Sequence, residues 1–199
     1  RELASELRDS GAVSVRARDY AQALNALRQA QEKLNRNQGD RAQRDIQAAK
    51  RDAEQLASEQ KEIASEVGQL GPTTPGARGK AQALADRKDA MDRKVGQLQK
   101  DLEALANDTR RDNKNASSKL DEAAGAIRDR RIREKIRYSR SQLGGSPTDY
   151  AKAMEDDISS NLDQLQRKIG EAESALGQQS KQNALGRSAD KAGDLVRGL

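Results

Sequence analysis

Arginine side chains are most concentrated between residues 128 and 140. This segment carries seven basic residues against Asp129 and Glu134, a net charge of +5 that equals the net charge of the whole 199-residue chain. At helical spacing, four of these side chains share one face, here called the basic stripe: Arg130, Arg133, Arg137 and Arg140. A row of guanidinium groups could bind phosphates, either in nucleic acid or in the head groups of acidic lipids.

An internal use of the same charges competes with this interpretation. A turn at residues 145–146 would pair two helices so that facing residues have numbers that sum to about 291. Acidic residues 155–157 would then lie opposite residues 134–137, and the opposite charges would fix the register of the helices. We expect internal pairing first and contact with a protein partner second. Acidic lipid stays open as an alternative, whereas nucleic acid is disfavoured because only Tyr138 is available for stacking on bases.

Residues for catalysis are scarce in this chain. It contains no His and no Cys, so a Ser-His or Cys-His nucleophile cannot be built within it and the commonest zinc ligands are missing. Its carboxylates are numerous but alternate with Lys and Arg, as on solvated helix faces. We therefore expect no enzyme activity, and no catalytic, cofactor or metal site.

The composition indicates which elements position these charges. Charged residues make up 35% of the chain and aromatic residues 2%, with no Phe and no Trp. Sheets favour β-branched and aromatic residues, whereas Ala, Leu, Gln, Glu, Lys and Arg favour helices. The predicted fold class is all-α, with long antiparallel helical hairpins that form a coiled-coil-like bundle around narrow apolar seams.

A first helical hairpin is predicted over residues 1–70. Its first helix, about 3–37, carries an apolar stripe that includes Tyr20, which we expect to be part of the core. Gly39 and Asp40 predict a tight turn, with Gly as the C-terminal cap of one helix and Asp as the N-terminal cap of the next. The second helix, about 40–70, keeps the four-three spacing of a coiled coil through its apolar residues: Ala42, Ile46, Ala49, Ala53, Leu56, Ile63, Val67 and Leu70.

A Gly- and Pro-rich linker, residues 71–79, separates this hairpin from a second one over residues 80–177. The predicted helices are about 80–143 and 147–177, joined by a loop in which Ser146 caps and Pro147 begins the returning helix. A single helix over 80–143 is favoured over a break near 113–118 in which Ser117 or Ser118 would cap a new helix. Residues 178–199 are predicted as a polar tail with a weak amphipathic helix.

A few polar and aromatic side chains also fall near the seams. The polar ones, which more often set helix register than form a site, are Gln31, Gln60, Lys88 and Asn161. Tyr138 and Tyr150 are predicted to face each other across the second hairpin, because their numbers agree with the sum of about 291 to within a few residues.

Several segments resemble a family of uncharacterised bacterial membrane-anchored proteins, in their Ala-, Gln- and Arg-rich helical C-terminal regions. The resemblance rests on residues 21–34, 39–42, 48–49 and 53–56, and on the run from Ile132 to Arg140 followed by residues 156–158 and 162–163. It implies a location in the bacterial envelope, on the periplasmic side, with membrane helices upstream of Arg1. A cytoplasmic location stays open as the alternative. The resemblance implies no activity.

The sequence as a whole predicts a non-enzymatic helical scaffold or protein interaction module within a larger bacterial envelope protein. Its partner would be another protein or a second copy of itself, and a membrane would be reached only through segments outside residues 1–199. The alternative function is polyanion binding, to nucleic acid or acidic lipid, through the basic stripe.

Overall fold

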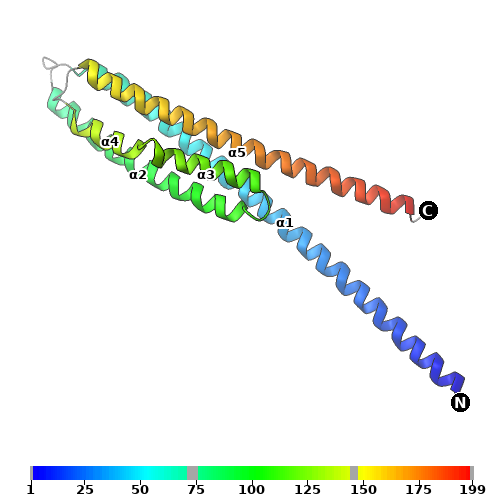
Figure 1. The fold of residues 1–199 in the computed structure, drawn as a ribbon. Helices are drawn as coiled ribbons and strands as arrows, with labels where there is room; N and C mark the ends of the chain where they lie inside the picture. The colour runs from blue at the N-terminus through cyan, green and yellow to red at the C-terminus, as the bar shows by residue number, and fades with distance from the viewer. Residues whose placement is uncertain (1, 71–75, 144–147, 198–199) are drawn as a thin grey trace. The chain divides into compact units, whose positions relative to one another are not determined.

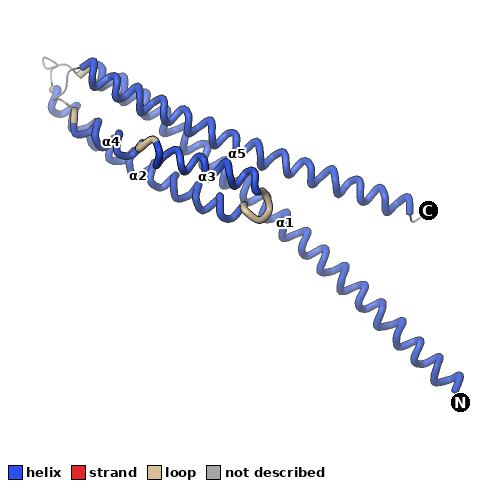
Figure 2. The backbone as a smooth tube through the Cα atoms, in the orientation of Figure 1, coloured by secondary structure: helices blue, strands red, loops and turns tan. Residues whose placement is uncertain are grey.

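Helices account for nearly all of residues 2–70, 76–143 and 148–197, which the computed structural model describes. Five helices follow one another in these ranges, with no strand among them (Figure 1, Figure 2): α1 (Glu2–Gly68), α2 (Ala77–Thr109), α3 (Lys114–Asp129), α4 (Ile132–Ser141) and α5 (Thr148–Arg197). The prediction of an all-α helical bundle is confirmed. The chain divides into two compact units, residues 1–41 and 42–199, each of which is described by itself.

The unit of residues 42–199 is a bundle of four helical columns: the second half of α1, α2, α3 followed by α4, and α5. Neighbouring columns run antiparallel, as pairs of salt bridges show: Arg87–Glu66 and Lys94–Glu59 between α1 and α2, Arg128–Glu103 and Arg140–Asp89 between α2 and α3–α4, and Lys119–Glu171 and Lys135–Asp157 between α3–α4 and α5. The chain therefore passes up and down the bundle four times, with short connections between neighbours.

The core is one cluster of aliphatic side chains from all five helices. Within each helix its large, fully buried apolar side chains lie four, seven or ten residues apart, on the same side of the helix; they include Ile46, Leu56, Ile63, Leu84, Met91, Leu98, Leu102, Leu120, Ile127, Ile132, Ile136, Ile158, Leu165 and Ile169. Alanines such as Ala53 and Ala123 lie between them and let neighbouring helices approach closely. Ile46, Leu56 and Ile63 belong to the seam predicted over residues 40–70, because the spacing of apolar residues marks the buried face of a helix whatever it packs against.

The predicted turn at Gly39 is wrong. Helix α1 continues from Glu2 to Gly68 without interruption, so residues 1–70 contain one helix and no hairpin. A single Gly inside a helix costs only about 1 kcal/mol relative to Ala, and the residues on either side include Arg, Gln and Ala, which favour helix. No atom outside the local helix backbone lies within 4 Å of the place that a Cβ on Gly39 would take.

The predicted single helix over 80–143 is also wrong, because the chain reverses direction after α2. Thr109 ends α2, and Asn113 caps α3 by accepting a hydrogen bond from the Ala116 backbone N–H at 2.9 Å. The Asn113 side chain also donates to the Ala175 carbonyl of α5 at 3.2 Å. Ser117, one of the two predicted caps, instead donates to the Ala106 carbonyl at 2.7 Å and ties α3 to α2.

A second interruption separates α3 from α4 at Arg130 and Arg131. Arg131 has a φ of 52°, in the left-handed region that non-glycine residues rarely adopt. The seam changes spacing at this place, because Ile127 and Ile132 are five residues apart instead of three or four. The left-handed residue ends one helix and starts the next, so that both isoleucines are buried in the same core.

The remaining predicted boundaries are met in part. Residues 71–75 of the predicted linker lie outside the described residues, as do residues 144–147, with the predicted cap Ser146 and with Pro147. Gly76, with a φ of 71°, precedes α2, and residues 77–79 belong to this helix. The predicted helix end near residue 177 is wrong, because α5 continues to Arg197. Leu185 and Val196 in its last part are exposed.

Candidate functional site

The basic stripe lies on α4 and on the residues that connect α4 to α3. Arg133, Arg137 and Arg140 are one to two turns apart on α4 and extend toward α2. Arg130 precedes the left-handed residue Arg131 and extends toward α5. The interruption between α3 and α4 therefore divides the stripe, and the four guanidinium groups do not share one face of the bundle.

Two of these arginines converge on one carboxylate of α2. Arg133 donates from Nε to Asp92 Oδ1 at 2.8 Å and from Nη2 to Asp92 Oδ2 at 3.1 Å. Arg137 donates from Nε to Asp92 Oδ2 at 3.0 Å. This fork geometry gives charge-assisted hydrogen bonds that hold α4 against α2 in one register.

The surroundings of Asp92 strengthen this contact. Although burial by itself would raise the pKa of Asp92, the hydrogen bonds from Arg133 and Arg137 lower it below its usual value. The hydrogen bond to Asp92 likewise raises the pKa of Arg133. A Cβ on Gly96, one turn along α2, would lie 2.9 Å from Arg133 Cζ, so the missing side chain leaves room for the guanidinium group.

Internal pairing occurs, but its main partner differs from the predicted one. Arg140 donates from Nε to Asp89 Oδ1 of α2 at 2.6 Å, so three of the four stripe arginines pair with α2. The prediction placed their acidic partners on α5. It is confirmed there for a neighbouring pair, since Lys135 Nζ and Asp157 Oδ2 lie 2.7 Å apart. The acidic partners on α2 were not predicted, because α2, α3 and α4 were expected to form one helix, in which α2 and α4 cannot face each other.

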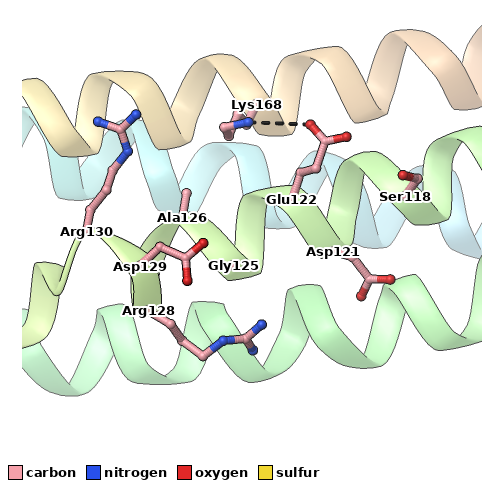
Figure 3. Close-up of a pocket in the computed structure, with 9 residues that line it drawn as sticks. All are labelled: Ser118, Asp121, Glu122, Gly125, Ala126, Arg128, Asp129, Arg130 and Lys168. Carbon is pink, nitrogen blue, oxygen red and sulfur yellow. Dashed lines mark hydrogen bonds and ion pairs between the residues drawn. The ribbon is translucent and has the colours of Figure 1, made fainter.

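Arg130 borders a shallow depression of about 660 Å³ between α3 and α5, which is open to solvent. Figure 3 shows Arg130 directed toward α5, Arg128 directed toward α2, and Lys168 next to Glu122. Arg130 Nη1 donates to Asn161 Oδ1 at 3.3 Å, and Arg128 pairs with Glu103 of α2. The charged side chains around the depression are three basic and three acidic: Arg128, Arg130, Lys168, Asp121, Glu122 and Asp129. This balance favours neither an anion nor a cation.

The most unusual feature of the bundle is a buried polar cluster, which joins four helices. It consists of Gln60 of α1, Lys88 of α2, Ser139 of α4 and Glu155 of α5. Lys88 Nζ and Glu155 Oε2 lie 2.6 Å apart, with side-chain exposures of 0% and 1%. Gln60 Nε2 donates to Glu155 Oε2 at 2.7 Å and to the Glu155 carbonyl at 3.2 Å. The Ser139 hydroxyl donates to the other carboxylate oxygen, Glu155 Oε1.

The cluster carries an electrostatic cost. Burial lowers the pKa of Lys88, and the attraction and hydrogen bond of Glu155 offset only part of this effect. Gln60 Oε1 is the one buried side-chain polar atom among the described residues that has no hydrogen-bond partner. Taking such groups out of water is expensive, and their best-attested use is to specify one arrangement of helices.

Sequence reasoning found only part of this cluster. Gln60 and Lys88 were recognised as polar residues on seams, and their expected role in helix register agrees with the observed contacts. Glu155 was predicted to pair with basic residues among 134–137, which is wrong, since it is buried and its ion pair is with Lys88 of α2. The available signal was its position, because Glu155 lies four residues after Ala151 and three before Ile158 on the seam of α5.

The three tyrosines give one confirmed and one wrong prediction. Tyr138 and Tyr150 face each other with their hydroxyl oxygens 3.5 Å apart, as the predicted register requires. This contact raises the pKa of Tyr150. Tyr20 was expected in a core, yet 76% of its surface is exposed. Its predicted partner was the second helix of a hairpin that does not form.

The unit of residues 1–41 presents an uncovered apolar stripe on α1. Its large side chains are exposed to 76%, 51%, 70% and 57% at Tyr20, Leu24, Leu27 and Leu34, in that order. They repeat at four- and three-residue intervals, with Gln31 in the remaining place. Within residues 19–41, no described side chain is buried. Single exposed apolar residues are common on protein surfaces, whereas a row of them on one helix face marks a contact surface.

Comparison of the chain with models of protein families, with curated proteins and with solved structures gives no match. Among the described helices, none combines the length and the apolar character needed to cross a membrane. The described residues also contain no group of three or more acidic side chains arranged to hold a metal ion. The charges, the buried polar cluster and the apolar stripe are therefore the features that bear on function.

Proposed function

We propose that this protein is a non-enzymatic helical scaffold that binds a protein partner through the apolar stripe of α1. The observation that carries the proposal is the exposure of Tyr20, Leu24, Leu27 and Leu34 on one helix face. Each large apolar side chain contributes roughly 1.5–3 kcal/mol when it is transferred from water to a fully buried site. A partner helix that covers the stripe would gain several such contributions.

The bundle of residues 42–199 supplies the rigid part of this scaffold. Its apolar core is continuous over all four columns, and the ion pairs of Asp92 with Arg133 and Arg137 tie α4 to α2. The cluster around Glu155 connects one side chain from each column. Such a cluster supports a bundle with a single helix register, as a scaffold requires, because any other register would leave buried charges unpaired.

The same observations argue against polyanion binding and against catalysis. Arg133, Arg137 and Arg140 already pair with Asp92 and Asp89, so a phosphate would have to compete with a carboxylate for each guanidinium group. Lys88 and Glu155 are buried, so a substrate in solution cannot contact them. For the compartment, we propose the bacterial envelope on the basis of the family resemblance, and cell fractionation tests this location.

Site-specific photo-crosslinking tests the proposed contact surface. The full chain is produced in its source cells with p-benzoylphenylalanine in place of Leu27, and a matched chain carries the same group in place of Gln29. Both positions are exposed on α1, but Gln29 lies on the opposite face of the helix from the apolar stripe. We expect a discrete adduct from position 27 and none from position 29. Equal adducts from both positions, or no adduct from position 27, would contradict the proposal.

A further inference from the structure

We propose that the partner of the apolar stripe is a second copy of this chain, bound parallel and in register. This inference rests on the proposed function and names the occupant of the same surface. In coiled-coil notation, Leu24 and Gln31 occupy a positions, whereas Tyr20, Leu27 and Leu34 occupy d positions. The stripe is a seam of about two heptads, and its side chains are uncovered.

Gln31 favours a parallel pair in register. In that arrangement each a residue faces the same residue of the other copy, so the Gln31 amide meets a second Gln31 amide. An amide is both donor and acceptor, and two of them can hydrogen-bond to each other. In an antiparallel pair a residues face d residues, which here are Leu or Tyr, and the buried amide would lose its hydrogen bonds.

A second glutamine defines the axial position of the two helices. Gln38 is the next a residue after Gln31, seven residues along α1, and it is also exposed. In register, both glutamines face their own counterparts at once. A shift by one heptad would place Gln31 opposite Leu24 or Gln38 and leave one amide opposite an apolar side chain. The glutamines therefore select one alignment out of several that the leucines alone would accept.

The positions beside the seam fit a second copy because no like charges face each other there. In a parallel pair these are the g and e positions, which bring Ala23 opposite Arg28 and Ala30 opposite Asn35 of the other copy. Charges at e and g are what normally direct a helix to a different partner. Arg28 is the one charged residue at these flanking positions of the two heptads, and it faces an alanine; Glu32 and Lys33 lie at b and c positions away from the seam.

The length of the stripe sets the expected strength of the contact. Fifteen residues of helix span about 22 Å. Two helices in contact over this length bury less than the roughly 1,200 Å² of total surface that separates stable complexes from weak ones. We therefore expect a reversible dimer whose population rises with concentration in the micromolar range and above.

Sedimentation equilibrium of the purified full chain tests the association. From about 1 μM to 1 mM, the average mass should rise from 21.7 kDa toward twice that value. Leu27→Glu, which places a charge in the seam, should lose this rise, whereas Gln29→Glu on the opposite face should keep it. Circular dichroism shows whether both variants keep the helix content of the wild type. A wild-type mass that stays at 21.7 kDa throughout would overturn the proposal.

Disulfide trapping tests the orientation, because the chain contains no cysteine of its own. Leu24→Cys places single thiols opposite each other only in the parallel, in-register pair, and oxidation should give a covalent dimer. Gln29→Cys is the matched control and should stay monomeric. A sedimenting dimer in which Leu24→Cys forms no disulfide would overturn the parallel alignment and with it the proposal.

The photo-crosslinking experiment separates this inference from the proposed function. An adduct from position 27 with the mass of two copies supports both. An adduct of any other mass overturns the second copy as the partner and leaves the scaffold proposal intact. The absence of an adduct from position 27 contradicts both.

Discussion

The Lys88 ammonium and the Glu155 carboxylate form an ion pair at 2.6 Å in the interior of the bundle, where neither side chain reaches solvent. Glu155 is the centre of the contact, since Gln60 and Ser139 also donate hydrogen bonds to its carboxylate. Four helices thus depend on one side chain of α5 for the pairing of their buried polar groups.

Removing one member of the pair should be far more damaging than removing both. We expect Lys88→Met to lower the free energy of unfolding by about 3–5 kcal/mol, because Glu155 would remain buried without its counter-charge. The double variant Lys88→Met with Glu155→Leu should recover most of this loss. Urea denaturation measures all three proteins. The matched control is Lys94→Met, which breaks the exposed pair with Glu59 and should cost less than about 1 kcal/mol.

The lowered pKa of Lys88 predicts how stability changes in alkali. Between the folded pKa and the unfolded value of 10.5, the unfolded chain binds more protons at this residue than the folded chain. The free energy of unfolding should therefore gain a positive slope with pH in this window from Lys88. Urea titrations at several alkaline pH values should show a steeper rise for the wild type than for Lys88→Met. Identical slopes would show that Lys88 is not the source.

Asp92 should contribute stability at neutral pH and lose it in acid. Its folded pKa is below the usual value of 3.8, so its contribution is fully present above pH 3.8 and disappears as the pH falls through the folded pKa. Asp92→Asn should cost about 1–3 kcal/mol at pH 7, since Arg133 and Arg137 lose their anionic partner. The difference from wild type should shrink below pH 3.8 in urea denaturation. Asp101→Asn, on an exposed part of α2, should show neither effect.

Gly96 and Arg133 should be energetically coupled. Replacing a helical Gly by Ala normally stabilises by about 1 kcal/mol, but a Cβ on Gly96 would displace the Arg133 guanidinium group from Asp92. We expect Gly96→Ala to give little gain in the wild type and about 1 kcal/mol in an Arg133→Gln background. Thermal denaturation of the four proteins of this cycle provides the comparison. Additive effects would mean that the two side chains do not compete for space.

The basic stripe should act in folding more than in binding. Replacing Arg130, Arg133, Arg137 and Arg140 by Gln is expected to lower the melting temperature, because three of the four hold α4 to α2. The wild-type chain should show no salt-dependent binding to duplex DNA or to vesicles with acidic lipids. Fluorescence anisotropy and vesicle sedimentation at low salt measure this. Tight binding that weakens steeply with salt would instead favour the polyanion alternative.

Local signals in the sequence were sufficient for the fold class and for one helix register. The composition determined that the chain is all-α, and the spacing of Ile46, Leu56 and Ile63 identified the buried face of α1 before its neighbours were known. The register sum of about 291 between α3–α4 and α5 is met by the contacts of Lys135 with Asp157 and of Arg130 with Asn161, and Tyr138 and Tyr150 meet within three residues of it. A short connection fixes which residues face each other, so this register follows from the sequence alone.

Only the tertiary structure decided where the chain turns and which polar groups meet. Gly39 is the stronger local helix breaker, yet α1 passes through it, while the chain reverses at residues 110–113. The helix propensities at Gly39 and at residues 110–113 differ by about 1 kcal/mol. The packing of α3 against α2 and the hydrogen bond from Asn113 to the Ala175 carbonyl can outweigh this difference. The pairing of Lys88 with Glu155 likewise required the reversal at 110–113. Until the four columns packed around one core, nothing in either residue's neighbourhood along the chain identified the other.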